Sequence, residues 1–139
     1  MLKFAMKDHF VASHWIGETQ MVRYMRWDEV QNEDLRPGLS RRCVHAEQLT
    51  VARVLLKKGI IIPEHSHINE QVTYILDGCL RFHINGETVD VHAGEVLCIP
   101  PNVPHSAEAM EDTIDLDVFQ PVRQDWVDGT DAYIRREQK

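Results

Sequence analysis

The feature that most constrains the fold is a series of short apolar–polar runs, each bounded by turn residues, in the middle and later parts of the chain. Each run is too short for a stable helix but long enough for a β-strand. Many short strands at close, even spacing are typical of a β-sandwich or barrel. The predicted strands cover residues 43–46, 49–57, 71–76, 80–84, 88–92, 96–99 and 113–120.

Two Gly-containing pairs predict the turns of β-hairpins. Asn85-Gly86 joins residues 80–84 to residues 88–92, and an Asn-Gly pair supplies the positive φ angles that a type I′ turn needs. Asp77-Gly78 is expected to make a similar turn before residue 79. In the first hairpin apolar and polar residues alternate, so one face packs in the core and the other is wet. His83 and His92 fall on the wet face and are predicted to be solvated, not metal ligands.

A His-x-His pair supplies the first candidate metal ligands. Residues two apart on a strand project from the same face, so His65 and His67 point the same way. Gln71 lies four residues beyond His67 and keeps this parity, whereas Glu70 points to the opposite face. The strand period therefore selects Gln71 as the third ligand, although a β-bulge would reverse the choice in favour of Glu70.

A proline-rich turn holds the fourth candidate ligand. His105 follows Pro100-Pro101-Asn102-Val103-Pro104, and a rigid turn of this kind fixes a ring at little further entropic cost.

The His-x-His segment resembles the first motif of the cupin family, which reads Gly, five residues, His-x-His, three or four residues, Glu, six residues and Gly. Gly59, His65, His67 and Gly78 are in register with it, and Gln71 stands at the Glu position.

The later segment is similar to the second cupin motif, in which Pro-x-Gly follows a first Gly and a His and an Asn come later. Gly94, Pro100 and His105 match, whereas Asn102 replaces the Gly and Ala109 the Asn. Over about residues 51–119 the resemblance implies an all-β cupin double-stranded β-helix, a jelly-roll barrel.

This set of residues predicts one divalent transition metal ion on His65, His67, Gln71 and His105. Three neutral imidazoles and a neutral amide leave the charge of the ion uncompensated, which favours Lewis-acid work on an anionic substrate over dioxygen activation. Mn, Fe, Ni, Co and Zn all remain candidates.

A third segment, residues 115–123, carries two acids on one strand face with Phe119. Periodicity alone favours a wet face for Asp115 and Asp117, with Leu116 and Val118 against the core. However, Asp-Val-Phe-x-Pro-x-Arg and His-Ser-His-x-x-Glu-Gln resemble segments of the pectin-degradation cupins, which open the ring of unsaturated monouronates.

That resemblance implies that Asp117, Phe119 and Arg123 line the site. Arg123 would clamp the uronate carboxylate, Asp117 would move a proton and Phe119 would wall the pocket. The alternative for Arg123 is a surface residue beside Asp125. Gln120 and Val122 depart from the family pattern and leave the substrate open.

The predicted function is therefore a metal-dependent enzyme that opens and ketonises an unsaturated monouronate. One alternative is an Fe(II) small-molecule dioxygenase, which predicts oxygen uptake. The other is a non-catalytic small-molecule-binding cupin, which predicts stabilisation by a ligand without turnover.

Composition indicates which partners and which cellular compartment to expect. The formal net charge of −7 disfavours nucleic acid, and no apolar run approaches a membrane span. Three cysteines, an odd number, argue against a disulfide framework and for a reducing, cytoplasmic location.

The chain is expected to form a single domain. Residues 1–40 are predicted to be an arm with edge strands, residues 41–122 the barrel, and residues 123–139 a C-terminal tail that forms a short helix or an arm. The apolar residues of the segment 2–16 predict that it packs on a partner in a homodimer or on its own barrel.

Overall fold

The computed structural model describes residues 4–6, 15–16, 19–20 and 22–136, and it divides into two compact units. The first unit ends at Asn32 and the second runs from Glu33 to the C-terminus. Most of the segment 2–16, in which the dimer contact is predicted, lies outside the described residues. The predicted homodimer therefore stays a prediction.

The first unit contains short strands and one 3-10 turn. Strand β1 pairs in parallel with β4, and β2 pairs antiparallel with β3. Their bounds are β1 Phe4–Met6, β2 Trp15–Ile16, β3 Thr19–Gln20, β4 Val22–Tyr24 and η1 Trp27–Glu29.

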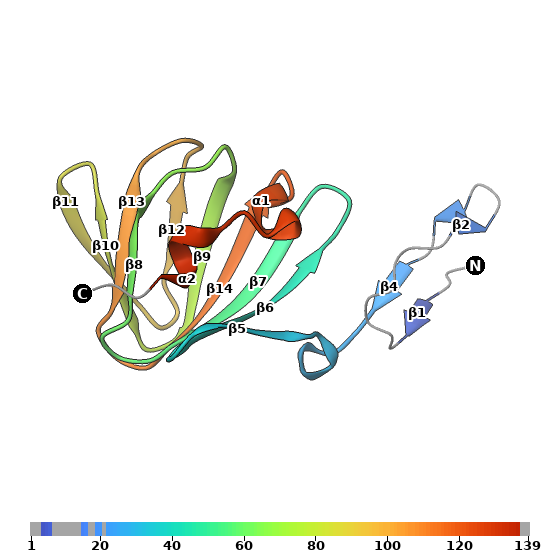
Figure 1. The fold of residues 1–139 in the computed structure, drawn as a ribbon, viewed down its shortest axis with the longest axis horizontal. Helices are drawn as coiled ribbons and strands as arrows, with labels where there is room; N and C mark the ends of the chain where they lie inside the picture. The colour runs from blue at the N-terminus through green and yellow to red at the C-terminus, as the bar shows by residue number, and fades with distance from the viewer. Residues whose placement is uncertain (1–3, 7–14, 17–18, 21, 137–139) are drawn as a thin grey trace. The chain divides into compact units, whose positions relative to one another are not determined.

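The second unit is a jelly-roll barrel of two sheets (Figure 1). The six-stranded sheet has the order β12-β9-β14-β7-β6-β5, and the four-stranded sheet has the order β11-β10-β13-β8. The strands are β5 Asn32–Arg36, β6 Leu39–His45, β7 Thr50–Leu56, β8 Ile61–His65, β9 Glu70–Asp77, β10 Cys79–Ile84, β11 Glu87–His92, β12 Val96–Ile99, β13 His105–Ala109 and β14 Thr113–Gln120.

The apolar core lies between the two sheets. Leu80 and Phe82 of β10 are 2% and 3% exposed. Ile75, on β9 of the other sheet, belongs to the same buried apolar cluster. Burying a side chain of this size stabilises the fold by about 1.5–3 kcal/mol. The alternation of β10 and β11 places His83 and His92 outside, exposed to solvent, as the sequence predicts.

The Asn85-Gly86 hairpin is confirmed. Ile84 pairs with Glu87, so the turn has two residues, and both have positive φ, 53° at Asn85 and 78° at Gly86. These angles are those of the type I′ turn that this pair favours.

The predicted hairpin at Asp77-Gly78 is wrong. Strand β9 pairs with β12 and β14, whereas β10 pairs with β11 and β13, so the chain crosses here from one sheet to the other. Gly78 has φ 90°, and a Cβ at this position would lie 2.4 Å from the carbonyl oxygen of Asp112. The glycine is needed for this close approach and not for a tight hairpin.

Two strands of the barrel carry little signal in the sequence. Strand β8 contains Pro63, which is tolerated because β8 is the edge of its sheet. Strand β13 reads His-Ser-Ala-Glu-Ala, with no β-branched or aromatic residue. Both strands contribute to the site.

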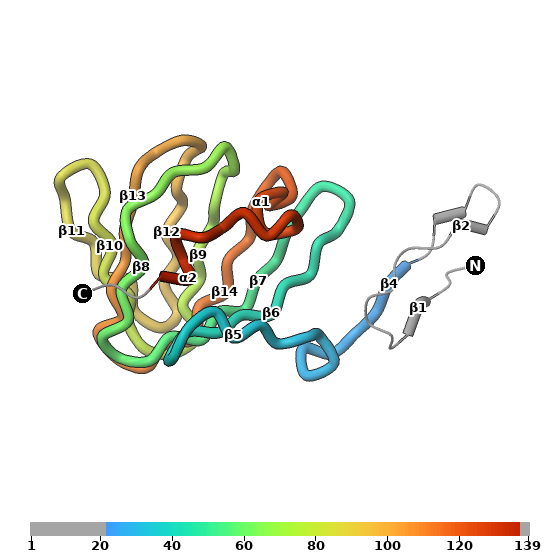
Figure 2. The backbone as a smooth tube through the Cα atoms, viewed as in Figure 1, coloured from blue at the N-terminus to red at the C-terminus, as the bar shows by residue number. Residues whose placement is uncertain are grey.

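The C-terminal segment forms two short helices, α1 Gln124–Asp128 and α2 Ala132–Arg135. Figures 1 and 2 show them, in red, in front of the barrel strands, and α2 packs against β8. Trp126 of α1 and Ile134 of α2 are buried in the core. Among the described residues no helix is long and apolar enough to cross a membrane.

Candidate metal centre

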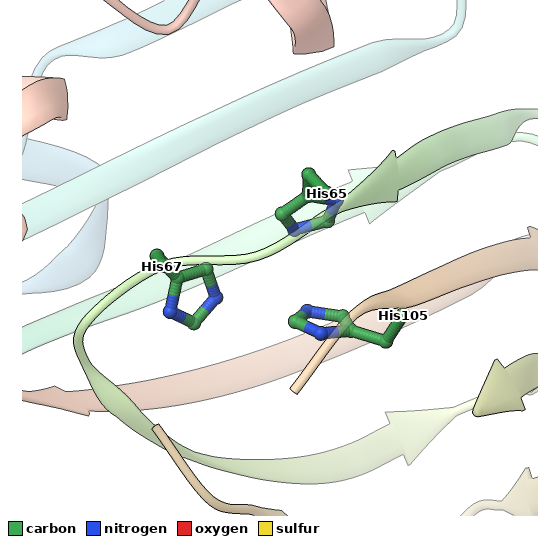
Figure 3. A group of neighbouring side chains, drawn as sticks. All are labelled: His65, His67 and His105. Atoms are coloured by element: carbon green, nitrogen blue, oxygen red, sulfur yellow. The ribbon is translucent and has the colours of Figure 1, made fainter. Parts of the chain in front are cut away.

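Three histidines meet at one end of the barrel, between the two sheets. His65 ends β8, His67 lies in the loop that follows, and His105 begins β13 directly opposite His65. Each offers one ring nitrogen, and these atoms all lie within 4.8 Å of one another. Figure 3 shows the three rings gathered around a common space.

The backbone selects one tautomer for each ring. Nδ1 of His65 lies 2.8 Å from the carbonyl oxygen of Pro63, Nδ1 of His67 3.0 Å from that of Asn69, and Nδ1 of His105 2.8 Å from that of Val103. A carbonyl oxygen only accepts, so each Nδ1 must carry the proton. Each Nε2 is then left with a free lone pair, which is the form that binds a metal.

Burial keeps these rings neutral. It lowers the pKa of His65 to about 3 and that of His67 to about 4, where the charge of Arg123 adds to the effect. Burial also lowers the pKa of His105. At neutral pH the three rings are therefore ready to act as ligands without first losing a proton.

Gln71 of β9 faces the same space. It is 6% exposed, whereas Glu70 is exposed on the other face, as the two-residue period of a strand predicts. The Gln71 side chain donates from Nε2 to Oγ1 of Thr73 at 2.9 Å, and Thr73 donates to Oδ1 of Asp117 at 2.7 Å. This series of hydrogen bonds orients Oε1 of Gln71 toward the histidines.

A metal cation fits the histidine ring nitrogens and the Gln71 oxygen that meet here. Oε1 of Gln71 lies 3.1 Å from Nε2 of His67, and both atoms carry lone pairs when Nδ1 of His67 is protonated. Nε2 of His105 is buried and has no hydrogen-bond partner. An ion shared by these atoms would satisfy all of them, and three imidazoles with an oxygen donor suit a divalent transition metal.

Strand β14 turns its acids inward. Asp115, Asp117 and Phe119 are 4%, 6% and 1% exposed, whereas Leu116 and Val118 are only half-buried. The wet face that periodicity favours is therefore wrong here. The two faces of β14 are both covered to some degree, and alternation alone does not say which one lines the barrel.

Burial raises the pKa of both acids, and their proximity strengthens the effect on Asp115. The pKa of Asp115 is raised well above its ordinary value, first by burial and then by the charge of Asp117. Burial also raises the pKa of Asp117, but hydrogen bonds from Asp115 and Thr73 oppose this rise. Asp115 therefore holds a proton more readily, and Asp117 accepts hydrogen bonds beside the histidines.

Arg123 lies at the site, but its guanidinium is largely engaged. Nε and Nη2 donate to the two oxygens of Asp125 at 2.9 and 2.7 Å, and Nη2 also donates to the hydroxyl of Tyr133 at 3.1 Å. Arg123 is 1% exposed, so it is not a surface residue. Its guanidinium also lies 4.7 Å from the ring centroid of Phe119.

The C-terminal helices cover the histidines. The ring of Tyr133 stacks on His65 with centroids 4.5 Å apart, and Trp126 meets Phe119 edge to face at 5.0 Å. A buried ion pair fastens this segment, because Nη2 of Arg41 lies 2.6 Å from Oδ2 of Asp131.

The enclosed space beneath these helices is small. A cavity of about 50 Å³ is lined by His65, Gln71, Asp117, Arg41 and Trp126, among others. A larger hollow of about 610 Å³ lies where Asp77 and Ile114 pair, toward the other ends of β9 and β14 from Gln71 and Phe119. The candidate ligands His65, Gln71 and His105 line the small cavity, and none of them lines the large hollow.

A second group of ligand types lies on the β10–β11 hairpin. Cys79, Asp90 and His92 also bring one ligand atom each to within 4.8 Å of one another. Asp90, however, is bound through both oxygens to Arg81, at 2.8 and 3.0 Å. The guanidinium of Arg81 already neutralises the Asp90 carboxylate, so this group is the weaker candidate for a metal site.

The sequence analysis misses two residues of the site, Thr73 and Arg41. Thr73 shares the strand parity of Gln71, and this signal could have identified it. Arg41 lies two residues after Leu39 on β6, and both are buried, whereas Arg42 is only half-buried. The predicted strand begins at residue 43, after Arg41, so strand parity makes no prediction for Arg41.

Comparison with known proteins agrees with this arrangement. Residues 52–119 match the family described as Cupin domain. Over 120 residues, 81% of the chain, the sequence is 31% identical to 3-hydroxyanthranilate 3,4-dioxygenase from Xenopus laevis. The alignment covers 41% of that enzyme, so the chain corresponds to well under half of its length.

Two solved structures have similar barrels. KdgF from Halomonas sp. superposes with a TM-score of 0.67 and 28% identity, over 71% of this chain and 94% of that one. A mutant of Bacillus subtilis oxalate decarboxylase superposes with a TM-score of 0.63 and 28% identity, over 70% of this chain and 29% of that one.

Proposed function

This chain is a cupin, and on that basis we propose that it is a metal-dependent enzyme that opens and ketonises an unsaturated monouronate. One observation carries the proposal. The histidine cluster and the buried Asp117 are joined through Gln71 and Thr73, so a metal site and a proton-transfer group share one cavity. The likeness to KdgF supports the choice of substrate.

In this proposal His65, His67, Gln71 and His105 hold one divalent ion, of Mn, Fe, Ni, Co or Zn. When bound, the ion supplies Lewis acidity toward an oxygen of the substrate. Asp117 gives and takes the proton as the enol ether opens, because burial keeps its pKa above the ordinary range and it lies on the cavity wall. Phe119 forms an apolar wall beside His67, with ring centroids 5.7 Å apart.

The size of the cavity adds a condition. About 50 Å³ is far below the roughly 300–1,000 Å³ of ordinary small-molecule sites. A monouronate therefore enters only if α1 and α2 move away from the barrel, which takes Tyr133 off His65. Such a closing segment would also exclude water from the reacting centre.

The test is turnover by protein reconstituted with Mn, Fe, Ni or Zn, followed as loss of the enol-ether absorbance of unsaturated monouronates. We expect metal-dependent loss in the wild type and at least a 100-fold slower rate for Asp117→Asn, within the ~10²–10⁴-fold range for general acid–base catalysis. Asp90→Asn, on the outer face, is the matched control and should turn over normally. No loss with any metal in loaded protein would overturn the proposal.

A dioxygenase is the second candidate, because the dioxygenase from Xenopus laevis aligns with 81% of the chain. It predicts oxygen uptake by the Fe(II)-loaded protein with 3-hydroxyanthranilate and none with a monouronate. A non-catalytic binding role would give stabilisation by one of these compounds with no turnover of either.

A further inference from the structure

Four buried side-chain polar atoms among the described residues have no hydrogen-bond partner, and all four belong to residues that line the small cavity. Two of them are explained already. Nε2 of His105 belongs to the metal centre, and Asp115 shares a hydrogen bond with Asp117 while its Oδ1 faces no donor. The other two atoms are donors, Nη1 of Arg41 and Nε1 of Trp126.

Arg41 is a buried cation with one side of its fork unused. Its Nε and Nη2 donate to Glu33 at 3.2 and 3.3 Å, and Nη2 also donates to Asp131 at 2.6 Å. Nη1 carries two N–H groups, and because the side chain is fully buried, neither of them can donate to bulk water. Leaving such donors unpaired costs free energy, which indicates that something in the cavity accepts from them.

Trp126 brings a second donor to the same wall. The guanidinium carbon of Arg41 lies 4.1 Å from the centroid of the Trp126 ring, and that of Arg123 lies 4.2 Å from it. Both guanidinium groups make cation–π contacts with the indole ring, while its Nε1 has no hydrogen-bond partner. Two guanidinium groups, each ion-paired on one side, and an indole N–H therefore line the same cavity.

Water alone is a poor match for this wall. About 50 Å³ is several times the ~10–15 Å³ that one water needs, so the cavity admits a group larger than a single water. A planar carboxylate offers two acceptor oxygens and the opposite charge, and the guanidinium fork and indole N–H are donors only.

We propose that Arg41 and Trp126 form a carboxylate-binding subsite, which holds the acid group of a small organic acid whose other end faces the histidines. The subsite deepens the proposed function and rests on it for the identity of the substrate. It differs from the sequence prediction, which gives the carboxylate to Arg123. Nε and Nη2 are engaged in both guanidinium groups, but Nη1 of Arg41, unlike Nη1 of Arg123, is a buried atom without a hydrogen-bond partner.

The test is binding of acetate to the metal-free full chain, with acetamide as the neutral isostere. The indole N–H resonance of Trp126 is followed by ¹⁵N–¹H NMR and assigned from its absence in Trp126→Phe. We expect a saturable shift of this resonance with acetate and none with acetamide at the same concentration.

Two variants then locate the anion by calorimetry. Trp126→Phe keeps the ring and removes one donor, and it should weaken acetate binding about tenfold, as expected for one hydrogen bond to a charged group. Arg41→Lys keeps a cation for Asp131 and should weaken binding further. Circular dichroism checks that each variant is folded, and Trp126→Phe carries the test if Arg41→Lys does not fold.

The inference is overturned if acetate leaves the Trp126 resonance unmoved, if Trp126→Phe binds as the wild type does, or if only Arg123→Lys loses binding. Because the assay uses no metal and no turnover, its failure is separate from that of the proposed function. Acetate binding at Trp126 without monouronate turnover would leave the subsite standing and remove the substrate assignment.

Discussion

Strand β14 and the β10–β11 hairpin show the same alternation of polar and apolar residues with opposite results. In the hairpin the apolar Leu80 and Phe82 are buried and the polar His83 is exposed. In β14 the polar Asp115 and Asp117 are buried, and the apolar Leu116 and Val118, which alternate with them, are half-buried. A polar residue on the inner face of a barrel therefore marks its functional interior, because a buried polar group needs partners there.

The largest expected effect is on metal binding, and it separates inner from outer histidines. His105→Ala removes an inner ring nitrogen that is a predicted metal ligand. Loss of a residue that only hydrogen-bonds a ligand lowers metal affinity by about 10–100-fold, so we expect loss of the ligand itself to lower it by more than about 100-fold. His83→Ala, on the outer face of the hairpin, should bind metal as the wild type does. Metal content after gel filtration and calorimetric titration measure both, and equal losses would contradict the assignment.

The next effect is on stability, and it compares an inner ion pair with an outer one. Arg41 and Asp131 are both fully buried, so Asp131→Asn leaves the Arg41 cation with Glu33 as its remaining partner and should cost about 3 kcal/mol in the free energy of unfolding, the lower end for breaking a buried pair. Asp90→Asn breaks the exposed pair with Arg81 and should leave the urea midpoint almost unchanged. A small effect for Asp131→Asn would mean that the C-terminal helices are not fastened by this pair.

The two kinds of acid should also give opposite pH dependences. The pKa of Asp115 is raised by burial, so the unfolded chain ionises first, near the ordinary value of about 3.9, and stability falls as pH rises from there toward the raised pKa. The pKa of Asp90 is lowered by its hydrogen bond with Arg81, so its contribution is present above about pH 4 and is lost as pH falls.

Urea unfolding of chelator-treated protein between about pH 2 and about pH 8 tests this contrast. Asp115→Asn should flatten the fall in stability at higher pH, whereas Asp90→Asn should flatten only the fall at acid pH. Parallel pH profiles for the wild type and Asp115→Asn would show that Asp115 is not held protonated.

The smallest effect is on thiol reactivity. Burial raises the pKa of Cys43 to about 12, whereas Cys98 is exposed on β12. Because the thiolate is the reactive form, iodoacetamide at neutral pH should label Cys98 well before Cys43. Mass spectrometry of timed samples identifies the labelled residue, and early labelling of Cys43 would mean that the inner face of β6 opens to solvent.

Local rules were enough to predict much of the barrel and the histidine end of the site. The Asn85-Gly86 turn follows from the positive φ angles that these two residues accept, and the inward position of Gln71 follows from strand parity with Glu70 outside. These features depend on near neighbours in the chain, so the sequence alone determined them. The same parity would have identified Thr73.

Other features were decided only by the tertiary structure. Alternation in β14 defines two faces, but packing of the two sheets decides that Asp117 is inside, because only then does one face of the six-stranded sheet become the interior. Asp131, the buried partner of Arg41, comes from the C-terminal segment and lies 90 positions along the chain from it. Contacts between segments so distant in sequence depend on how the whole chain packs, and no local pattern in the sequence contains that information.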